Sequence, residues 1–234
     1  MSKSDKDRKK HGRNGKDYQR RSPSRKPQKS FLLVVEGETE ELYFKKYKDD
    51  ARSNLIDIHI DNPGGTDPGT LVNRAMELKQ RMEREAKRSE FVVQYEEVWV
   101  VYDLEDPHHI RREQSDRVKQ RADTKENNIQ FAISDPSFEY WYILHFERTT
   151  KSFNDANEIE KYLKQLWNGY KKATPPPRHV YEKTSTAIEN AKWVRKELAK
   201  SNSIAPKTDV DFLVVKLIES ISVRNPNKPS ASTN

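Results

Sequence analysis

The sequence has no cysteine and no long hydrophobic run. Without cysteine the chain can form no disulfide, no thiolate metal site and no cysteine nucleophile, which fits a cytoplasmic protein. No apolar run approaches the roughly 20 residues that a membrane span needs, and no apolar segment follows the N-terminal positive charges as in a secretion signal. The sequence therefore predicts a cytoplasmic protein without a membrane partner, built around one domain of ordinary size.

Positive charge is concentrated at the N-terminus. The formal net charge is +7, but residues 1–30 hold 12 Lys or Arg against 3 Asp, whereas the remainder holds 32 basic against 34 acidic side chains. Few apolar residues interrupt this segment, so we expect residues 1–30, and likewise 223–234, to be disordered tails. Two interpretations of the N-terminal tail stay open. It is either a solubilising leader or an arm that binds nucleic-acid phosphates without recognising sequence.

Short apolar runs alternate with helical patterns in the first half of the chain. Strands are predicted at 31–35, 55–60, 98–102 and 129–134, and helices at 38–50, 70–87 and 111–125. Further helices are predicted at 137–146, 155–167, 184–200 and 209–222, with a proline-rich connector at 171–178. This alternation predicts an α/β fold, in which helices flank a mostly parallel four-stranded sheet and additional C-terminal helices complete a single domain over 31–222.

Two acidic clusters directly follow buried strands. Glu36 ends the first strand in VVEGETEE, and Asp103 ends the third in VVYDLED, with Glu105 and Asp106 close behind. Carboxyl ends of parallel strands meet at one sheet edge, where such folds place their sites. Carboxylate oxygens suit Mg²⁺ or Mn²⁺, and a cation relieves their mutual repulsion. Taken singly, each cluster equally fits solvated loop or cap residues, but together they predict a divalent metal site.

The segment SDPSFEYWYILHF, residues 134–146, combines aromatic side chains with Glu139 and His145. Its aromatic positions predict a buried helix without any appeal to function. A carboxylate among apolar side chains is costly unless it is paired or binds a ligand, so Glu139 is a candidate catalytic residue. His145 is either a general base or a hydrogen-bonded structural residue. Lys183 and Arg178 are candidate contacts to a nucleic acid on their charge alone.

These motifs resemble those of a known family. The pattern Glu36-Gly37-x-Thr39-Glu40 after one strand, and Asp103-x-Glu105 after another, resembles the Toprim domain of topoisomerases, primases and related nucleases. The second motif departs from the usual Asp-x-Asp, because Glu105 replaces its last acid and Asp106 stands beside it. The residues Pro136, Phe138, Glu139, Trp141 and His145 are similar to the signature of RloB-like proteins, a Toprim family associated with restriction and abortive-infection loci. The resemblance covers roughly residues 31–221.

The resemblance implies a Toprim-like sheet and a role for each acid. Glu36 would act as an acid/base or metal-coordinating residue, and Asp103 with Glu105 or Asp106 would hold the metal. The implied function is a metal-dependent nuclease that cleaves DNA or RNA in anti-phage defence. An alternative is a dormant subunit that works with an ATPase encoded nearby, and a blander one is a nucleic-acid binder without chemistry. Candidate partners are therefore nucleic acid, such an ATPase and a second copy of the chain.

Overall fold

The computed structural model describes residues 29–52, 56–64, 67–104, 110–122, 128–201 and 203–222. The two predicted tails lie outside these ranges, except that Lys29 and Ser30 already belong to the first strand, β1. The strand therefore begins two residues earlier than its apolar run suggested. The predicted metal ligands Glu105 and Asp106 also lie outside the described residues.

A five-stranded sheet forms the centre of the molecule, in the order β2-β1-β3-β4-β5. Its strands are β1 (Lys29–Val35), β2 (Ile56–Asp61), β3 (Glu97–Asp103), β4 (Ile129–Asp135) and β5 (Lys207–Thr208). The first four are parallel, and β5 pairs antiparallel with the end of β4. The predicted α/β fold with a mostly parallel sheet is confirmed. The predicted count of four strands is wrong, because two-residue β5 is too short to show any alternation.

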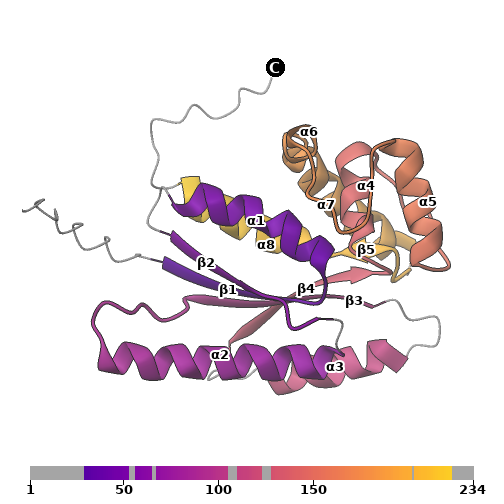
Figure 1. Ribbon diagram of the computed structural model, residues 1–234. Coiled ribbons are helices and arrows are strands. Elements are labelled where there is room, and N and C mark those ends of the chain that lie inside the picture. Colours follow the sequence, from indigo (N-terminus) through magenta and orange to yellow (C-terminus); the bar gives the residue numbers. More distant parts are fainter. Residues whose placement is uncertain are drawn as a thin grey trace, which may run out of the picture.

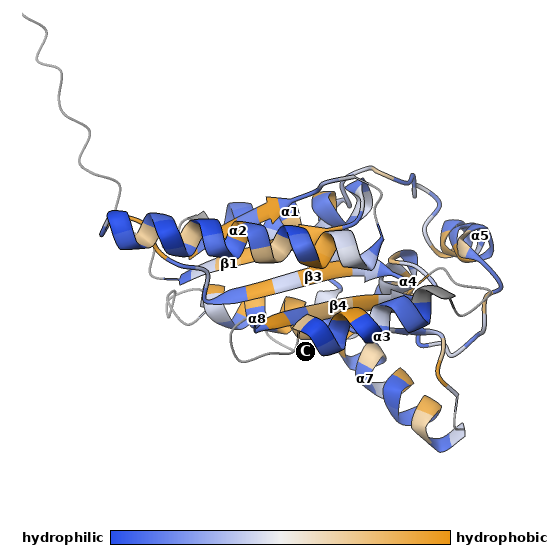
Figure 2. Ribbon diagram, turned by 90° about the horizontal axis from the view of Figure 1, so that it is seen from below, coloured by the Kyte–Doolittle hydropathy of each residue, from blue (hydrophilic) through white to orange (hydrophobic). Residues whose placement is uncertain are grey.

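Two layers of helices enclose the sheet (Figure 1). The helices α1 (Glu38–Arg52) and α8 (Val210–Ser222) cover one face, and α2 (Pro68–Arg88) and α3 (Ile110–Ala122) cover the other. Successive side chains of a strand point to opposite faces. Leu33 of β1 accordingly packs in the core beneath α1, and its neighbour Leu32 packs in the core beneath α2. Seen from the α2 side, the outer surfaces of α2 and α3 are largely hydrophilic, as expected for solvent-facing helices (Figure 2).

The remaining helices gather beyond the end of β4 (Figure 1). They are α4 (Glu139–Phe146), α5 (Ala156–Leu166), α6 (Arg178–Tyr181) and α7 (Thr184–Ser201). The residues of α4 from Glu139 to His145 are all buried, because the helix packs between α5 and α7 and against the aromatic side of α1. The predicted helix began at Ser137, two residues too early. Among the described residues no helix is long and apolar enough to cross a membrane.

Candidate functional site

Four carboxylates that are buried or half-buried meet in one cavity of about 240 Å³ at the carboxyl edge of the sheet, and the exposed Glu38 lines it as well. Glu36 follows β1, Asp103 ends β3, Glu40 lies in the first turn of α1, and Glu139 begins α4. They converge because β1 and β3 are parallel neighbours and α4 starts where β4 ends, at the same edge. The structure thus brings together Glu36, Asp103 and Glu139, three residues singled out from the sequence, and adds Glu40.

Glu36 is held against the end of β3 by two hydrogen bonds. Its backbone N–H donates to the carbonyl of Val101 at 3.0 Å, and its Oε2 accepts from the backbone N–H of Asp103 at 3.0 Å. The Oδ1 of Asp103 is buried and accepts no hydrogen bond from any described residue. A buried carboxylate oxygen without a donor is costly. Asp103 therefore presents a free ligand atom inside the cavity.

Glu40 is the site residue that the sequence interpretation did not single out, although it belongs to the family-like motif. Its side chain lines the cavity and is only 4% exposed, whereas Glu38, which also lines the cavity, is exposed at the helix start. Gly37 leaves room for it, since a Cβ at that position would lie 3.0 Å from Glu40 Oε2. The spacing within the first turn of α1 therefore leaves Glu38 exposed and buries Glu40, although both line the cavity.

Burial and mutual repulsion raise two pKa values in the cavity. The pKa of Asp103 lies well above its ordinary value, first because of burial and then because of the charges of Glu40 and Glu139. The pKa of Glu40 rises to about 7, mainly through burial and further through Glu139 and Glu36, while Lys172 opposes the rise. In the absence of a cation, the cavity therefore holds protons at neutral pH.

Glu139 is fixed by the connector between α5 and α6, residues 167–177. The Tyr170 hydroxyl donates to Glu139 Oε1 at 2.8 Å, and the Ser137 hydroxyl donates to Oε2 at 2.7 Å. Lys172 Nζ lies 3.9 Å from the same Oε1. The connector closes the cavity on its other side, because the backbone N–H of Ala173 donates to Thr39 Oγ1 at 3.4 Å. Nothing in the sequence of this connector indicated that it forms a wall of the site.

The three other predicted functional residues that the structure describes do not line the acidic cavity. His145 lies at the opposite end of α4, with Nδ1 2.9 Å from the carbonyl oxygen of Trp141, and burial lowers its pKa to about 4. Lys183 Nζ lies 4.6 Å from the centre of the Phe146 ring, and exposed Arg178 pairs with Glu182 at 2.9 Å. The predicted roles of these three residues in catalysis or nucleic-acid binding stay predictions without support from their position.

The donor atoms of the cavity fit a divalent cation such as Mg²⁺. In the part of the chain that the structure describes, no group of three or more His, Cys, Asp or Glu side chains is arranged to hold a metal ion. Mg²⁺, however, usually takes one or two protein carboxylates and completes its shell with water and substrate phosphates. Glu36 and the unpartnered Oδ1 of Asp103 meet that requirement, and both are hard oxygen donors.

The fold and the cavity define an α/β protein with a buried acidic site at the carboxyl edge of a parallel sheet. The chain belongs to the RloB-like family, because the model of that family, described as RloB-like protein, matches residues 31–217. The predicted family is therefore confirmed. The matched range includes every carboxylate that lines the cavity and the connector that covers them. No curated protein and no solved structure matches the chain.

Proposed function

We propose that this protein is a metal-dependent nuclease with a Toprim-like site, which hydrolyses phosphodiester bonds of DNA or RNA as an effector of anti-phage defence. One observation carries the proposal: four carboxylates share one small cavity, and the Oδ1 of Asp103 is buried there without a hydrogen-bond donor among the described residues. Like charges gathered in a buried cavity destabilise the fold unless they serve a ligand. A divalent cation is the ligand that suits such oxygens.

In this proposal Glu36 and Asp103 hold Mg²⁺ or Mn²⁺, and Glu105 or Asp106 supplies a further ligand. A bound cation would serve as a Lewis acid that stabilises the charge developing on the phosphate. The backbone contact between Glu36 and Asp103 keeps their two carboxylates together before any ligand arrives. Such preorganisation lowers the cost of assembling the site.

Glu40 is the proposed proton carrier. With a pKa of about 7 it can both accept and release a proton near neutral pH, as a general acid or base must. Glu139 is a positioning residue at the back of the cavity, because Ser137 and Tyr170 both donate to it. Lys172, whose side chain is largely exposed beside Glu139, supplies a positive charge that attracts a substrate phosphate.

The test compares Asp103→Asn with Asp57→Asn. Both replace an aspartate carboxylate by an amide, but Asp57 is exposed on edge strand β2. The full-length proteins are incubated with labelled single-stranded DNA, duplex DNA and RNA in Mg²⁺, Mn²⁺ or EDTA. We expect cation-dependent cleavage by the wild type and Asp57→Asn, and none by Asp103→Asn. Cleavage that survives both EDTA and Asp103→Asn would refute the proposal.

Thermal unfolding supplies a readout that does not depend on activity. A cation at a hundred times its Kd stabilises the folded state by about 2.7 kcal/mol. Saturating Mn²⁺ should therefore raise the Tm of the wild type and Asp57→Asn by several degrees, and leave that of Asp103→Asn unchanged. An equal rise in all three proteins would place the cation elsewhere.

A further inference from the structure

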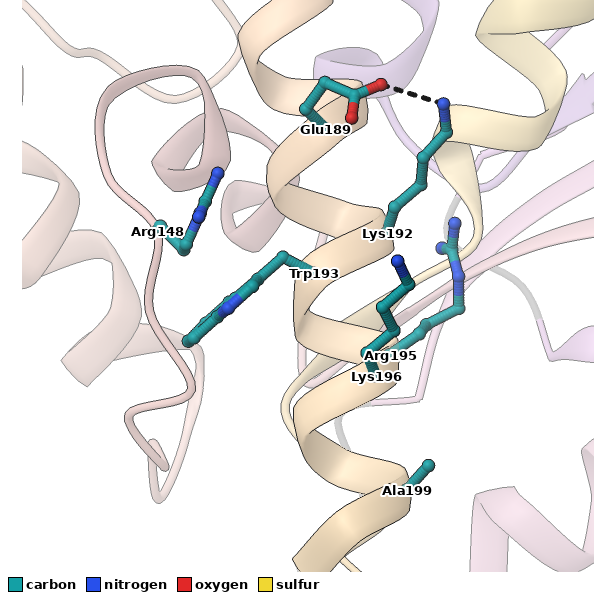
Figure 3. Close-up of a pocket in the computed structure, with 7 residues that line it drawn as sticks. All are labelled: Arg148, Glu189, Lys192, Trp193, Arg195, Lys196 and Ala199. Carbon is teal, nitrogen blue, oxygen red and sulfur yellow. Dashed lines mark hydrogen bonds and ion pairs between the residues drawn. The ribbon is translucent and has the colours of Figure 1, made fainter.

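A second cavity, of about 600 Å³, lies along α7 (Figure 3). We call it the α7 groove, and its lining residues are Arg148, Glu189, Lys192, Trp193, Arg195, Lys196 and Ala199. Arg148 lies in the segment that follows α4, and the others come from α7. No lining residue is shared with the acidic cavity. The groove was not anticipated from the sequence.

Four cationic side chains line the α7 groove against one carboxylate. Arg195 and Lys196 follow Lys192 by three and four residues. All three therefore lie on one side of the helix. Arg148 lies beside Trp193, on the other side of the α7 ribbon from Lys192 and Arg195 (Figure 3). Outside residues 1–30 the chain holds 32 basic against 34 acidic side chains. The positive charge of the groove is therefore a local concentration and does not reflect a basic domain.

Aromatic rings accompany these cations. The guanidinium of Arg148 lies 5.4 Å from the centre of the partly exposed Trp193 ring, and that of Arg195 lies 4.3 Å from the Phe212 ring. Phe212 is 48% exposed and lines an adjoining cavity, to which Lys192 also belongs. Two arginine-capped rings thus lie on neighbouring cavities that share a lysine. Rings interleaved with cations are the arrangement by which proteins bind unpaired bases and their phosphates.

The lysines of the groove are free to exchange partners. Lys192 pairs with Glu189 at 2.8 Å, but both side chains are more than half exposed, and such pairs contribute little. Lys196 is exposed one turn further along the helix. Arg195 is different, because both its terminal nitrogens donate to the buried carboxylate of Asp211. Arg195 therefore has a structural role in the groove. The exposed ammonium groups of Lys192 and Lys196 are available to a ligand.

We propose that the α7 groove binds single-stranded nucleic acid, with phosphates at Lys192 and Lys196 and a base against Trp193. The phosphates of a duplex would pair with the lysines, but its bases stay stacked and do not reach the Trp193 ring. An acidic peptide would pair with the lysines and make no stacking contact with the ring. That these single strands are also the substrate of the acidic cavity rests on the proposed nuclease function. The two sites are joined through α4, because Glu139 at its start lines the acidic cavity and Arg148, two residues beyond its end, lines the groove.

The first experiment tests the lysines by fluorescence anisotropy with labelled oligothymidylate and oligouridylate. Full-length protein is used in EDTA, so the result is independent of any metal or cleavage. The variant Lys192→Glu/Lys196→Glu is compared with Arg84→Glu/Lys87→Glu, which makes the same charge change at exposed positions of α2 on the far side of the sheet. We expect at least tenfold weaker binding, and a salt slope smaller by about 1.4, for the α7 variant only.

The second experiment tests the ring. Trp193→Leu should weaken binding of the single strands roughly fivefold to a hundredfold, and Trp193→Phe should largely preserve it. Thermal unfolding checks that both variants fold, since Trp193 also packs on the core. A duplex of equal length should bind more weakly than the single strand and respond little to Trp193→Leu.

Three outcomes would overturn the inference. Equal losses in the α7 and α2 charge variants would assign binding to general charge, including the basic tail. A duplex that binds as tightly as the single strand, with no effect of Trp193→Leu, would exclude base stacking. Competition by poly-glutamate as strong as that by the oligonucleotide would indicate an acidic protein partner instead. Because EDTA is present throughout, each of these results leaves the test of Asp103 untouched, and failure of that test leaves the groove standing.

Discussion

The acidic cavity and the α7 groove differ in how each carries its charge. Glu40 and Glu139 are 4% and 2% exposed, whereas Lys192 and Lys196 stand in solvent on one side of a helix. Buried like charges lower the stability of the folded state, and exposed ones hardly affect it. A buried acidic cluster must therefore be neutralised, by protons or by a bound cation. An exposed basic cluster indicates a binding site only when neighbouring groups support it. Here the two aromatic rings packed against Arg148 and Arg195 do so.

The acidic cavity is proposed to carry out cleavage and the α7 groove to bind single strands. The variant Glu36→Gln tests whether these two functions are separate. The amide keeps an oxygen to accept the hydrogen bond from Asp103, so the fold should survive. We expect turnover to fall roughly 100- to 10,000-fold, while binding of single strands in EDTA stays within about twofold of the wild type. Lys192→Glu/Lys196→Glu should do the reverse, raising KM at nearly constant kcat. Parallel losses in both properties for either variant would contradict a division of labour.

Arg195 lies in the groove but should behave as a core residue. Replacing it by methionine leaves the Asp211 carboxylate, which is 1% exposed, without its cation. Because an uncompensated buried charge is costly, we expect a loss of about 3 kcal/mol of unfolding free energy and a Tm lower by roughly 6–12 °C. Lys196→Met is the control and should change stability by less than about 0.5 kcal/mol. Equal stabilities would mean that the pair is not structural.

Glu40 makes the stability of the metal-free protein depend on pH. Its folded pKa of about 7 exceeds the ordinary value of 4.5, so the folded state retains a proton that the unfolded state releases. This contribution to stability is complete below pH 4.5 and is lost as the pH rises through about 7. Glu40→Gln should therefore stabilise the protein by about 2–3 kcal/mol at pH 8 and hardly at all near pH 4.5.

Denaturant unfolding in EDTA at the two pH values measures this effect. Glu38→Gln, in the same helical turn but exposed, is the matched control and should show no such pH-dependent gain. A variant Glu40→Gln that is less stable than the wild type at pH 8 would contradict the prediction, because it would mean that the charged carboxylate is well accommodated.

His145 should contribute to stability in the opposite pH range. Burial lowers its pKa from 6.5 to about 4, so its contribution is complete above pH 6.5 and is lost as the pH falls through about 4. Between pH 7 and pH 5 the wild type should lose about 2 kcal/mol that His145→Gln does not lose, with exposed His179→Gln as the control. Turnover at pH 7 should be unaffected. A hundredfold loss would instead make His145 the general base.

The sequence predicted what depends on local pattern. The strands β1 and β3 contain continuous apolar runs, and the acids at their ends, Glu36 and Asp103, had to meet at one edge because the two strands are neighbours. What it could not predict depends on tertiary packing. Lys172 enters the acidic cavity from a connector more than 130 residues beyond Glu36, and no periodicity marks it. The three basic positions of α7 are visible in the sequence, but Arg148 joins them only through the packing of α4 against α7.

The connector over the acidic cavity also sets an order of events during synthesis. Glu36, Glu40 and Asp103 leave the ribosome early, and Glu139 follows, but the wall made by Tyr170 and Lys172 arrives only after α5 has been translated. A nascent chain with all its cavity carboxylates therefore lacks the groups that fix Glu139. Since domains fold as the chain emerges, the cavity is completed by one of the later segments to appear, and an incomplete chain carries the acids without the finished site.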